Sequence, residues 1–239
     1  MELKNPIWFC IPRVVKWLVE ARDRDAHSLN DEVRAGINFS IILNSACFLE
    51  GALESGLIAV LESHRNGDDP LSSRLSDEVK ERVSWTTGYK KYDELFELVV
   101  GVAAHDLTEA RVLWDGVKSL FTLRNVLAHG RAVSHKLVFP SGKNARWREE
   151  LTGNYKSVHG YLLQKQLIPK QIVPLDGDWF FLADSIADHF WNLATSFIVA
   201  VGNSLSETES KVFKEVTHIP SQFQVPSQPL RNTGKGGQS

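Results

Sequence analysis

The sequence of 239 residues is poor in cysteine, in excess charge of either sign and in uninterrupted apolar runs. Its two cysteines, Cys10 and Cys47, are too few for the disulfide framework of a small secreted protein. Because both stand among apolar residues, we expect both thiols to be buried. The formal net charge of −2 lacks the global basic bias of a sequence-tolerant DNA-binding protein. The longest apolar stretch, residues 190–201, is too short to span a bilayer, and the N-terminus does not follow the pattern of a signal peptide. We therefore expect a cytoplasmic protein that does not enter a membrane.

The usual motifs for cofactors and nucleophiles are also missing. The eight histidines form neither a His-x3-His nor a His-Glu-x-x-His pattern. There is no glycine-rich phosphate-binding loop, and no elbow motif surrounds a serine or a cysteine. Asp184, Asp188 and His189 have the spacing of metal ligands on a helix, but we interpret them as a solvated acidic face. The sequence therefore predicts neither a metal nor an organic cofactor.

Helical periodicity dominates the first 130 residues. The spacing of apolar residues predicts helices over about residues 7–26, 31–64, 71–83, 92–104 and 108–129. The second of these is apolar on nearly all sides, which is typical of a central, buried helix. Asn30 or Asp31 can cap its beginning. These features indicate a helical bundle built around one long helix.

The texture of the sequence changes after this helical part. Residues 131–182 combine alternating and β-branched stretches with many prolines and glycines, which favours two or three short strands in loops. Helical spacing returns over residues 181–213. We therefore predict a mainly α fold, a single domain over residues 1–216. It consists of a bundle of five or six helices with a small β/loop insertion at about 131–180 before the last long helix. The polar residues 217–239 are predicted to be a disordered tail.

One segment stands out as a candidate site: Arg-Asn-Val-Leu-Ala-His-Gly, which begins at Arg124 and ends the helix predicted over 108–129. The Arg-x4-His spacing alone is uninformative, because Arg22 and His27 show it within a charged run. On a helical wheel, however, Arg124 falls inside an apolar stripe, whereas Asn125 and His129 fall on the polar face. The stripe consists of Val112, Leu113, Val117, Leu120, Leu123 and Leu127.

A charge inside an apolar stripe needs a partner, because an unpaired buried charge is costly. Glu50 is a second charge of this kind, at a wheel position that the buried helix otherwise fills with Phe39, Leu43, Leu57 and Leu61. We therefore predict a mostly buried ion pair between Arg124 and Glu50 that orients the guanidinium. Such a pair would also suit a purely structural role.

The motif at the end of a late helix resembles the HEPN superfamily, whose members carry an arginine, a polar residue directly after it, and a histidine four to six residues beyond the arginine. A glutamate in the context Phe48-Leu49-Glu50 on an earlier helix also resembles many members. The likeness covers about residues 7–130 and 181–213. It does not extend to the 131–180 insertion or to the tail.

The resemblance implies a metal-independent endoribonuclease that cleaves single-stranded RNA as a homodimer, with the arginine and histidine of both copies in one cleft. His129 would be the general base or acid, Arg124 would hold the phosphate, and Asn125 would orient His129 or donate to the phosphate. The resemblance also suggests a toxin or phage-defence effector with an antitoxin or regulatory partner. Because the superfamily includes inactive members, a non-catalytic interaction module is the alternative.

A basic and aromatic stretch in the insertion is a candidate RNA contact. Lys143, Arg146, Trp147 and Arg148 combine positive charge with a ring on which a base can stack; a solvated loop is the alternative. Tryptophans in or beside the predicted helices are instead expected to pack in the core. These are Trp8, Trp17, Trp85, Trp114 and Trp191.

Overall fold

Helices form most of the structure, a computed structural model that describes residues 7–24, 29–64, 70–84, 88–129, 135–138, 148–151, 155–168 and 182–218. In chain order the first helices are η1 (Ile7–Cys10), α1 (Ile11–Arg24), α2 (Asp31–Ser63), α3 (Pro70–Ser84) and α4 (Tyr89–Val100). Next come η2 (Ala104–Asp106), η3 (Arg111–Leu113), α5 (Trp114–Ala128), α6 (Tyr155–Gln164), α7 (Asp184–Ser204) and α8 (Glu207–Thr217). Between α5 and α6 stand the strands β1 (His135–Val138) and β2 (Arg148–Leu151). The prediction of a mainly helical bundle is confirmed.

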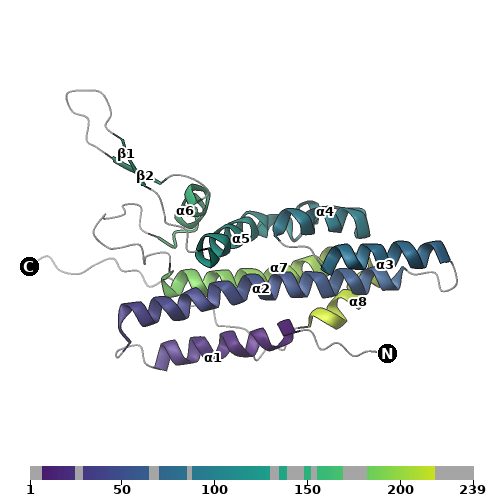
Figure 1. Ribbon diagram of the computed structural model, residues 1–239, viewed down its shortest axis with the longest axis horizontal. Helices are drawn as coiled ribbons and strands as arrows, with labels where there is room; N and C mark the ends of the chain where they lie inside the picture. Colours follow the sequence, from purple (N-terminus) through teal and green to yellow (C-terminus); the bar gives the residue numbers. More distant parts are fainter. Residues whose placement is uncertain are drawn as a thin grey trace, which may run out of the picture.

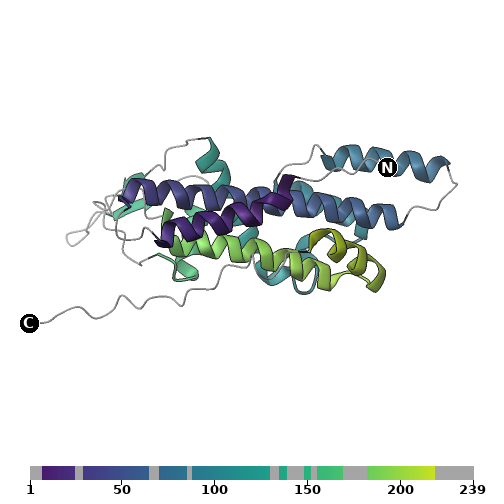
Figure 2. The ribbon, with the colours of Figure 1, turned by 90° about the horizontal axis from the view of Figure 1, so that it is seen from below.

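The long helix α2 is the centre of the bundle. It contacts α1, α3, α4, α5, α7 and α8, and Figure 1 shows α1 on one side of it and α4 and α5 on the other. In the view from below, α1 runs alongside α2 and α7 (Figure 2). Asn30 caps α2, as predicted, because its side chain accepts a hydrogen bond of 2.8 Å from the backbone N–H of Val33.

Two glycines of α2 let neighbouring aromatic rings approach its backbone. A Cβ atom at Gly51 would lie 2.6 Å from the side chain of Trp8, and one at Gly56 would lie 2.2 Å from the ring of Phe213. The absence of a side chain at these positions therefore seats η1 and α8 against α2.

The composition of α2 resembles that of a membrane-spanning helix. Its most apolar window of 18 residues has a mean hydropathy of 1.4, so α2 is long and apolar enough to cross a membrane by these two measures alone. In the fold, 56% of that window is buried among the other helices. This burial is what the wheel pattern predicts for a central bundle helix.

Part of the insertion differs from its predicted structure. β1 and β2 pair in antiparallel fashion, with His135 opposite Leu151. The stretch that follows was expected to be a strand but forms the helix α6. Its buried side chains are spaced three and four apart along the chain, which is the period of a helix and not of a strand; they are Tyr155, Val158, Tyr161 and Leu162.

The C-terminal helical part is also divided differently from the prediction. The single helix expected over residues 181–213 is two helices, α7 and α8. Ser206 begins α8 with a capping box, in which the Glu209 carboxylate accepts a hydrogen bond of 3.2 Å from the Ser206 backbone N–H. The buried Thr217 still belongs to α8, one residue beyond the predicted domain boundary at 216. The predicted disordered tail lies outside the described residues from 219 onward.

Several predictions about single residues need correction. Trp8, Trp114 and Trp191 lie in the core as expected, and Trp85 lies outside the described residues. Trp17, Cys10 and Cys47, however, are exposed. The reason is position: η1 and α1 lie at the edge of the bundle and pack with one side only, and Cys47 lies on a side of α2 that the described helices do not seal.

Candidate functional site

Arg124, near the end of α5, reaches the middle of α2 and forms an ion pair with Glu50. The guanidinium Nη2 donates to Oε2 of Glu50 over 2.6 Å, which confirms the predicted contact. The Arg124 and Glu50 side chains keep 23% and 15% of their surface exposed, so both are mostly buried, as predicted. The partial exposure leaves part of the guanidinium open to a ligand.

Glu50 also holds the beginning of α4. Its Oε1 accepts a hydrogen bond of 3.1 Å from the backbone N–H of Gly88, and its backbone carbonyl accepts one of 3.2 Å from the Tyr92 hydroxyl. Gly88 has a φ of 87°, a conformation that residues with a side chain rarely adopt. One carboxylate therefore ties α5 and α4 to the central helix, and Arg124 is positioned by a network that spans three helices.

Asn125 fixes the other end of the guanidinium. Nη1 of Arg124 donates to the Asn125 side-chain oxygen over 2.9 Å. Two nitrogens of Arg124 are thus held in a fixed orientation, as a planar fork requires for phosphate recognition. Within the described residues, the Asn125 side chain contacts Arg124 and not His129. The Asn125 side chain is therefore bonded to the guanidinium.

His129 stands at the C-cap of α5. Its backbone N–H bonds to the carbonyl of Asn125 over 3.3 Å, which closes the last turn. The residue is exposed, and no hydrogen bond to its imidazole arises from the part of the chain that the structure describes. An imidazole placed in this way is accessible to solvent and to a substrate.

The stripe that led to Arg124 is only partly buried. Val117, Leu120 and Leu123 are in the core, but Val112 is 78% exposed. Val112 belongs to η3, before α5 begins, and so it does not share the wheel on which we placed it. Arg124 itself and its neighbours Leu120, Leu123 and Leu127 lie within α5 and do share one helical wheel.

The surroundings of the ion pair are acidic on balance. Burial raises the pKa of Glu54, one turn along α2 from Glu50, and the charge of Glu50 raises it further. Burial and the same carboxylate raise the pKa of Tyr92 above its usual range, so its hydroxyl remains a hydrogen-bond donor. Glu50 neutralises the charge of Arg124. In one copy of the chain, the group formed by Glu50, Arg124 and Asn125 therefore has no net positive charge that could attract a phosphate.

The candidate RNA contacts of the insertion cannot be placed against this cluster. Lys143, Arg146 and Trp147 lie outside the described residues. Arg148 begins β2, and its side chain also lies outside the description.

A groove of about 430 Å³ lies elsewhere, between α3 and α4, and includes neither Arg124 nor His129. It is lined by Arg82, Lys91, Glu94, Leu95, Glu97 and Leu98. Among the described residues, no three His, Cys, Asp or Glu side chains are arranged to hold a metal ion.

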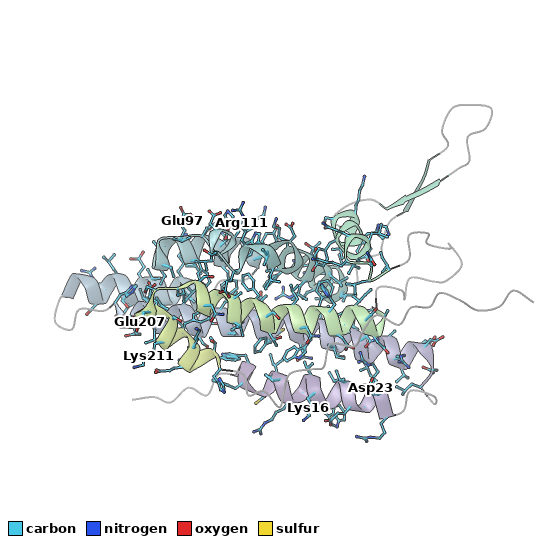
Figure 3. The ribbon with its side chains drawn as sticks, turned by 180° about the vertical axis from the view of Figure 1, so that it is seen from behind. Lys16, Asp23, Glu97, Arg111, Glu207 and Lys211 are labelled. Atoms are coloured by element: carbon cyan, nitrogen blue, oxygen red, sulfur yellow. The ribbon has the colours of Figure 1, made fainter. Side chains whose placement is uncertain are left out.

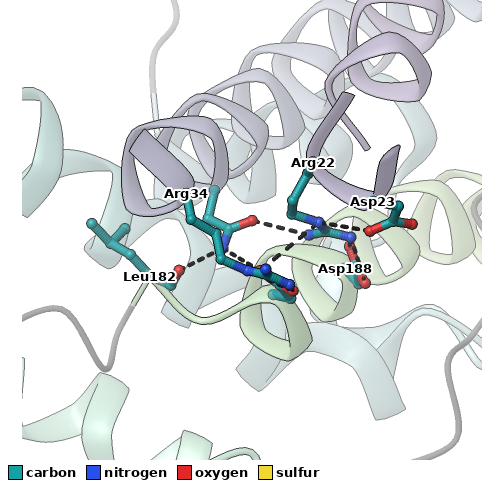
Figure 4. Close-up of polar contacts among 7 residues, drawn as sticks. Arg22, Asp23, Arg34, Leu182 and Asp188 are labelled. Carbon is teal, nitrogen blue, oxygen red and sulfur yellow. Dashed lines mark hydrogen bonds and ion pairs between the residues drawn. The ribbon is translucent and has the colours of Figure 1, made fainter. Parts of the chain in front are cut away.

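A second charged cluster was missed in the sequence. Arg22, which we placed in a charged run, is fully buried and donates through Nη2 to both carboxylate oxygens of Asp188, over 2.9 and 3.1 Å (Figure 4). Its Nη1 donates to the side chain of Asn38 over 2.9 Å. Asp188 is itself buried, so the acidic face that we expected to be solvated is wrong at this position. The signal was present: on the wheel of α1, Arg22 falls among Ile11, Val15 and Leu18.

The same cluster continues to Asp184 at the start of α7. Arg34 donates to this carboxylate from Nε over 2.9 Å, and the Asn38 amide donates to it over 2.7 Å. Burial alone would raise the pKa of Asp184, but these hydrogen bonds and the charge of Arg22 lower it below its ordinary value. At Asp188 burial dominates and raises the pKa despite Arg22. The cluster joins α1, α2 and α7, and the Arg22 guanidinium is fully buried. We therefore interpret the cluster as a structural contact between these three helices.

Comparison with known proteins adds no assignment to this geometry. Neither the protein-family models, nor the curated proteins, nor the solved structures give a match to this chain. The candidate site therefore consists of Arg124, Asn125 and His129 at the end of α5 with their partner Glu50 on α2.

Proposed function

We propose that the protein is a metal-independent endoribonuclease of the HEPN type that cleaves single-stranded RNA, with Arg124, Asn125 and His129 as its site. The observation that supports this proposal is the Arg124 guanidinium, held at 2.6 Å by Glu50 and at 2.9 Å by Asn125, with an exposed histidine five residues further along at the end of the same helix. In this proposal the helical bundle corresponds to the HEPN domain, with residues 131–180 as its β/loop insertion before the last long helix, α7.

The chemistry uses the substrate's own nucleophile. The ribose 2′-oxygen attacks the adjacent phosphorus as a base removes its proton. The bond between phosphorus and the 5′-oxygen breaks, and that oxygen takes up a proton from an acid. The products are a 2′,3′-cyclic phosphate and a 5′-hydroxyl. His129 is the group of the motif that moves a proton near neutral pH. Arg124 stabilises the charge that develops on the phosphate oxygens.

This chemistry favours a homodimer with a composite site. Two proton transfers need a base and an acid, and one copy of the motif supplies a single imidazole. Glu50 also offsets the charge of Arg124, so one copy binds a phosphate weakly. A twofold pairing of the exposed ends of α5 brings two imidazoles and two guanidinium groups into one cleft.

The proposed activity also suggests a biological role for the protein. An RNase without a dedicated cofactor suits a cytoplasmic toxin or phage-defence effector, whose activity an antitoxin or other regulatory partner holds in check. A partner that covers the exposed Asn125 and His129 would achieve this.

The alternative is a HEPN-like interaction module without activity. The observation that favours it is the bonding of Glu50, which links Arg124 to Gly88 and so joins α5 to α4. A purely structural pair would make the same contacts.

An RNase assay separates the two. We expect the purified protein to cleave single-stranded RNA in the presence of EDTA and to leave DNA intact, because DNA lacks the attacking hydroxyl. His129→Ala should lower the rate about 10²-fold or more, the usual size of a lost general acid or base. Arg124→Lys should also impair cleavage, because an ammonium does not reproduce the planar fork.

The matched control is His218→Ala, because His218 is also an exposed C-cap histidine, at the end of α8. Its variant should cleave like the wild type. Loss of activity in EDTA, or full activity in His129→Ala, would contradict this mechanism. The non-catalytic interaction module would then be the better explanation.

A further inference from the structure

Positive charge is concentrated in one part of the chain. Residues 116–175 contain ten lysines and arginines but only two carboxylates, Glu149 and Glu150, so this segment has a formal charge of +8 in a protein whose net charge is −2. The rest of the chain is correspondingly acidic. Such a separation of charge is typical of a segment that meets a polyanion. The basic segment begins within α5 and includes the whole of α6.

The helix α6 is attached to the bundle through one side. Val158 and Leu162 on this side are buried. The Tyr161 hydroxyl lies 2.7 Å from Nε2 of His189 on α7, and its oxygen would lie 2.5 Å from a Cβ atom at Gly116 of α5. α6 therefore packs closely against the helix that carries the candidate site, and its opposite side faces solvent.

The exposed side of α6 combines lysines with an open stretch of backbone. Lys156, Gly160 and Gln164 are exposed and recur at every fourth residue, so they share one side of the helix, and the exposed Lys165 follows directly. Nothing lies within 4 Å of a Cβ atom built at Gly160. Residues 155–168 contain no aspartate or glutamate. This side of α6 is therefore positive and not crowded by other elements.

The two lysines of α6 differ from other exposed lysines in their partners. Lys118, on α5, pairs with Asp115 over 2.8 Å. Among the residues that the structure describes, no carboxylate pairs with Lys156 or Lys165. The charge of Lys165 instead lies 5.8 Å from the centre of the Tyr161 ring. The positive charge of α6 is therefore not neutralised within the described part of the chain.

The position of α6 in the molecule sets it apart from the mixed charges of the other helices. Figure 1 shows α6, β1 and β2 together beside α5, whereas α3 and α8 lie toward the other end. In the view from behind, Glu97, Arg111, Glu207 and Lys211 also lie toward that other end (Figure 3). Both signs of charge occur there, whereas α6 carries one sign only.

We propose that the exposed side of α6 binds the phosphate backbone of single-stranded RNA and holds the substrate beside α5. This inference rests on the proposed nuclease function, because it assigns a binding surface to the same substrate. Lysine ammonium groups attract phosphates without reading the base sequence. The missing side chain at Gly160 lets a strand approach the helix backbone between the two lysines. Glu50 neutralises Arg124, so α6 supplies positive charge that the candidate site itself lacks.

Fluorescence anisotropy with a labelled single-stranded RNA tests the surface in the full chain. His129→Ala serves as the background, because it keeps the RNA intact during the measurement. We expect the double variant Lys156→Ala, Lys165→Ala to bind about 5-fold more weakly per lysine at ~0.1 M salt. The slope of log affinity against log salt should become shallower by about 1.4, because each phosphate contact on a single strand contributes ~0.7.

The matched control is the double variant Lys211→Ala, Lys214→Ala. It removes the same charge from two exposed positions of α8, and it should bind RNA like the background protein. An equal loss of affinity in the two double variants overturns the proposal, because the effect would then come from net charge alone.

A second pair of variants tests the surface without removing a side chain. Gly160→Glu places a carboxylate on the exposed side of α6, and Gly160→Gln places a neutral side chain of the same size there. Both residues are better helix formers than glycine, and the position is open, so both variants should fold. We expect the glutamate variant to bind RNA more weakly and the glutamine variant to bind like the background. Equal affinities of the two overturn the proposal.

The outcomes separate this surface from the nuclease. Cleavage is measured in the wild type, whereas affinity is measured in the His129→Ala background. RNA that binds through α6 without being cleaved supports the surface and contradicts the nuclease. Cleavage with unchanged affinity in the α6 variants supports the nuclease and contradicts the surface. A protein that does not bind single-stranded RNA contradicts both.

Discussion

At the scale of single residues, Glu50 is the group on which the candidate site depends. We expect Glu50→Ala to destabilise the fold by about 1–3 kcal/mol, because it leaves the Arg124 guanidinium and the Gly88 N–H without their shared acceptor in a partly buried place. Urea unfolding measures the difference. The control Glu97→Ala removes an exposed carboxylate and should change stability by less than about 0.5 kcal/mol. Equal effects of the two variants would mean that the ion pair contributes nothing to the fold.

His189 is expected to make the stability of the fold depend on pH, independently of the Arg124–His129 motif. It lies 2.7 Å from the Tyr161 hydroxyl, and burial, with a smaller effect from Lys165, lowers its pKa to about 4. The unfolded chain takes up this proton near pH 6.5 and the folded chain only near pH 4. Stability is therefore full above pH 6.5 and falls as the pH drops toward 4, by at most about 3 kcal/mol.

The measurement is the melting temperature between pH 4 and 7 for the wild type and His189→Gln. Glutamine can keep the hydrogen bond to Tyr161 but does not titrate. We expect the difference between the two melting curves to shrink as the pH falls, since the penalty is specific to the imidazole. A constant difference would show that His189 does not titrate in this window.

At the scale of helices, we expect alanine substitutions at two glycines of α2 to change the stability of the protein in opposite directions. Gly56→Ala should destabilise the protein, because its Cβ would lie 2.2 Å from the Phe213 ring and would push α8 away. Gly36→Ala should stabilise it by up to about 1 kcal/mol, because nothing lies within 4 Å and alanine is the better helix former. Thermal unfolding of both variants, with Phe213→Leu as the rescue of Gly56→Ala, tests the packing. A stabilising Gly56→Ala would contradict the seating of α8 on α2.

At the scale of the whole molecule, the composite site predicts that activity depends on pairing. The protein should dimerise through the ends of α5. Its RNase activity per copy should then fall on dilution in step with the fraction of dimer. Protein that is monomeric at tens of micromolar and still cleaves RNA would refute the composite site.

The sequence by itself determined the helices whose pattern is long and regular. The wheel of α2 indicates burial on nearly all sides, and this settles both its central place and the need for a partner at Glu50. The pairing of Glu50 with Arg124 followed from the cost of an unpaired charge in an apolar stripe. The same reasoning would have found Arg22, which also lies in an apolar stripe, but we interpreted it only as part of a charged run.

The tertiary structure decided what depends on neighbours. The apolar stretch around residues 158–163 suits a strand or a helix, and packing against α5 selects the helix α6. Trp17 and Cys47 are apolar enough for the core, yet whether a helix face is covered depends on which elements pack on it. The contact of Arg22 with Asp188 joins residues 166 positions apart, and local periodicity carries no information at that separation. The sequence pattern thus predicts which side of a helix is apolar enough to be buried. The packing of the whole bundle determines which element covers that side.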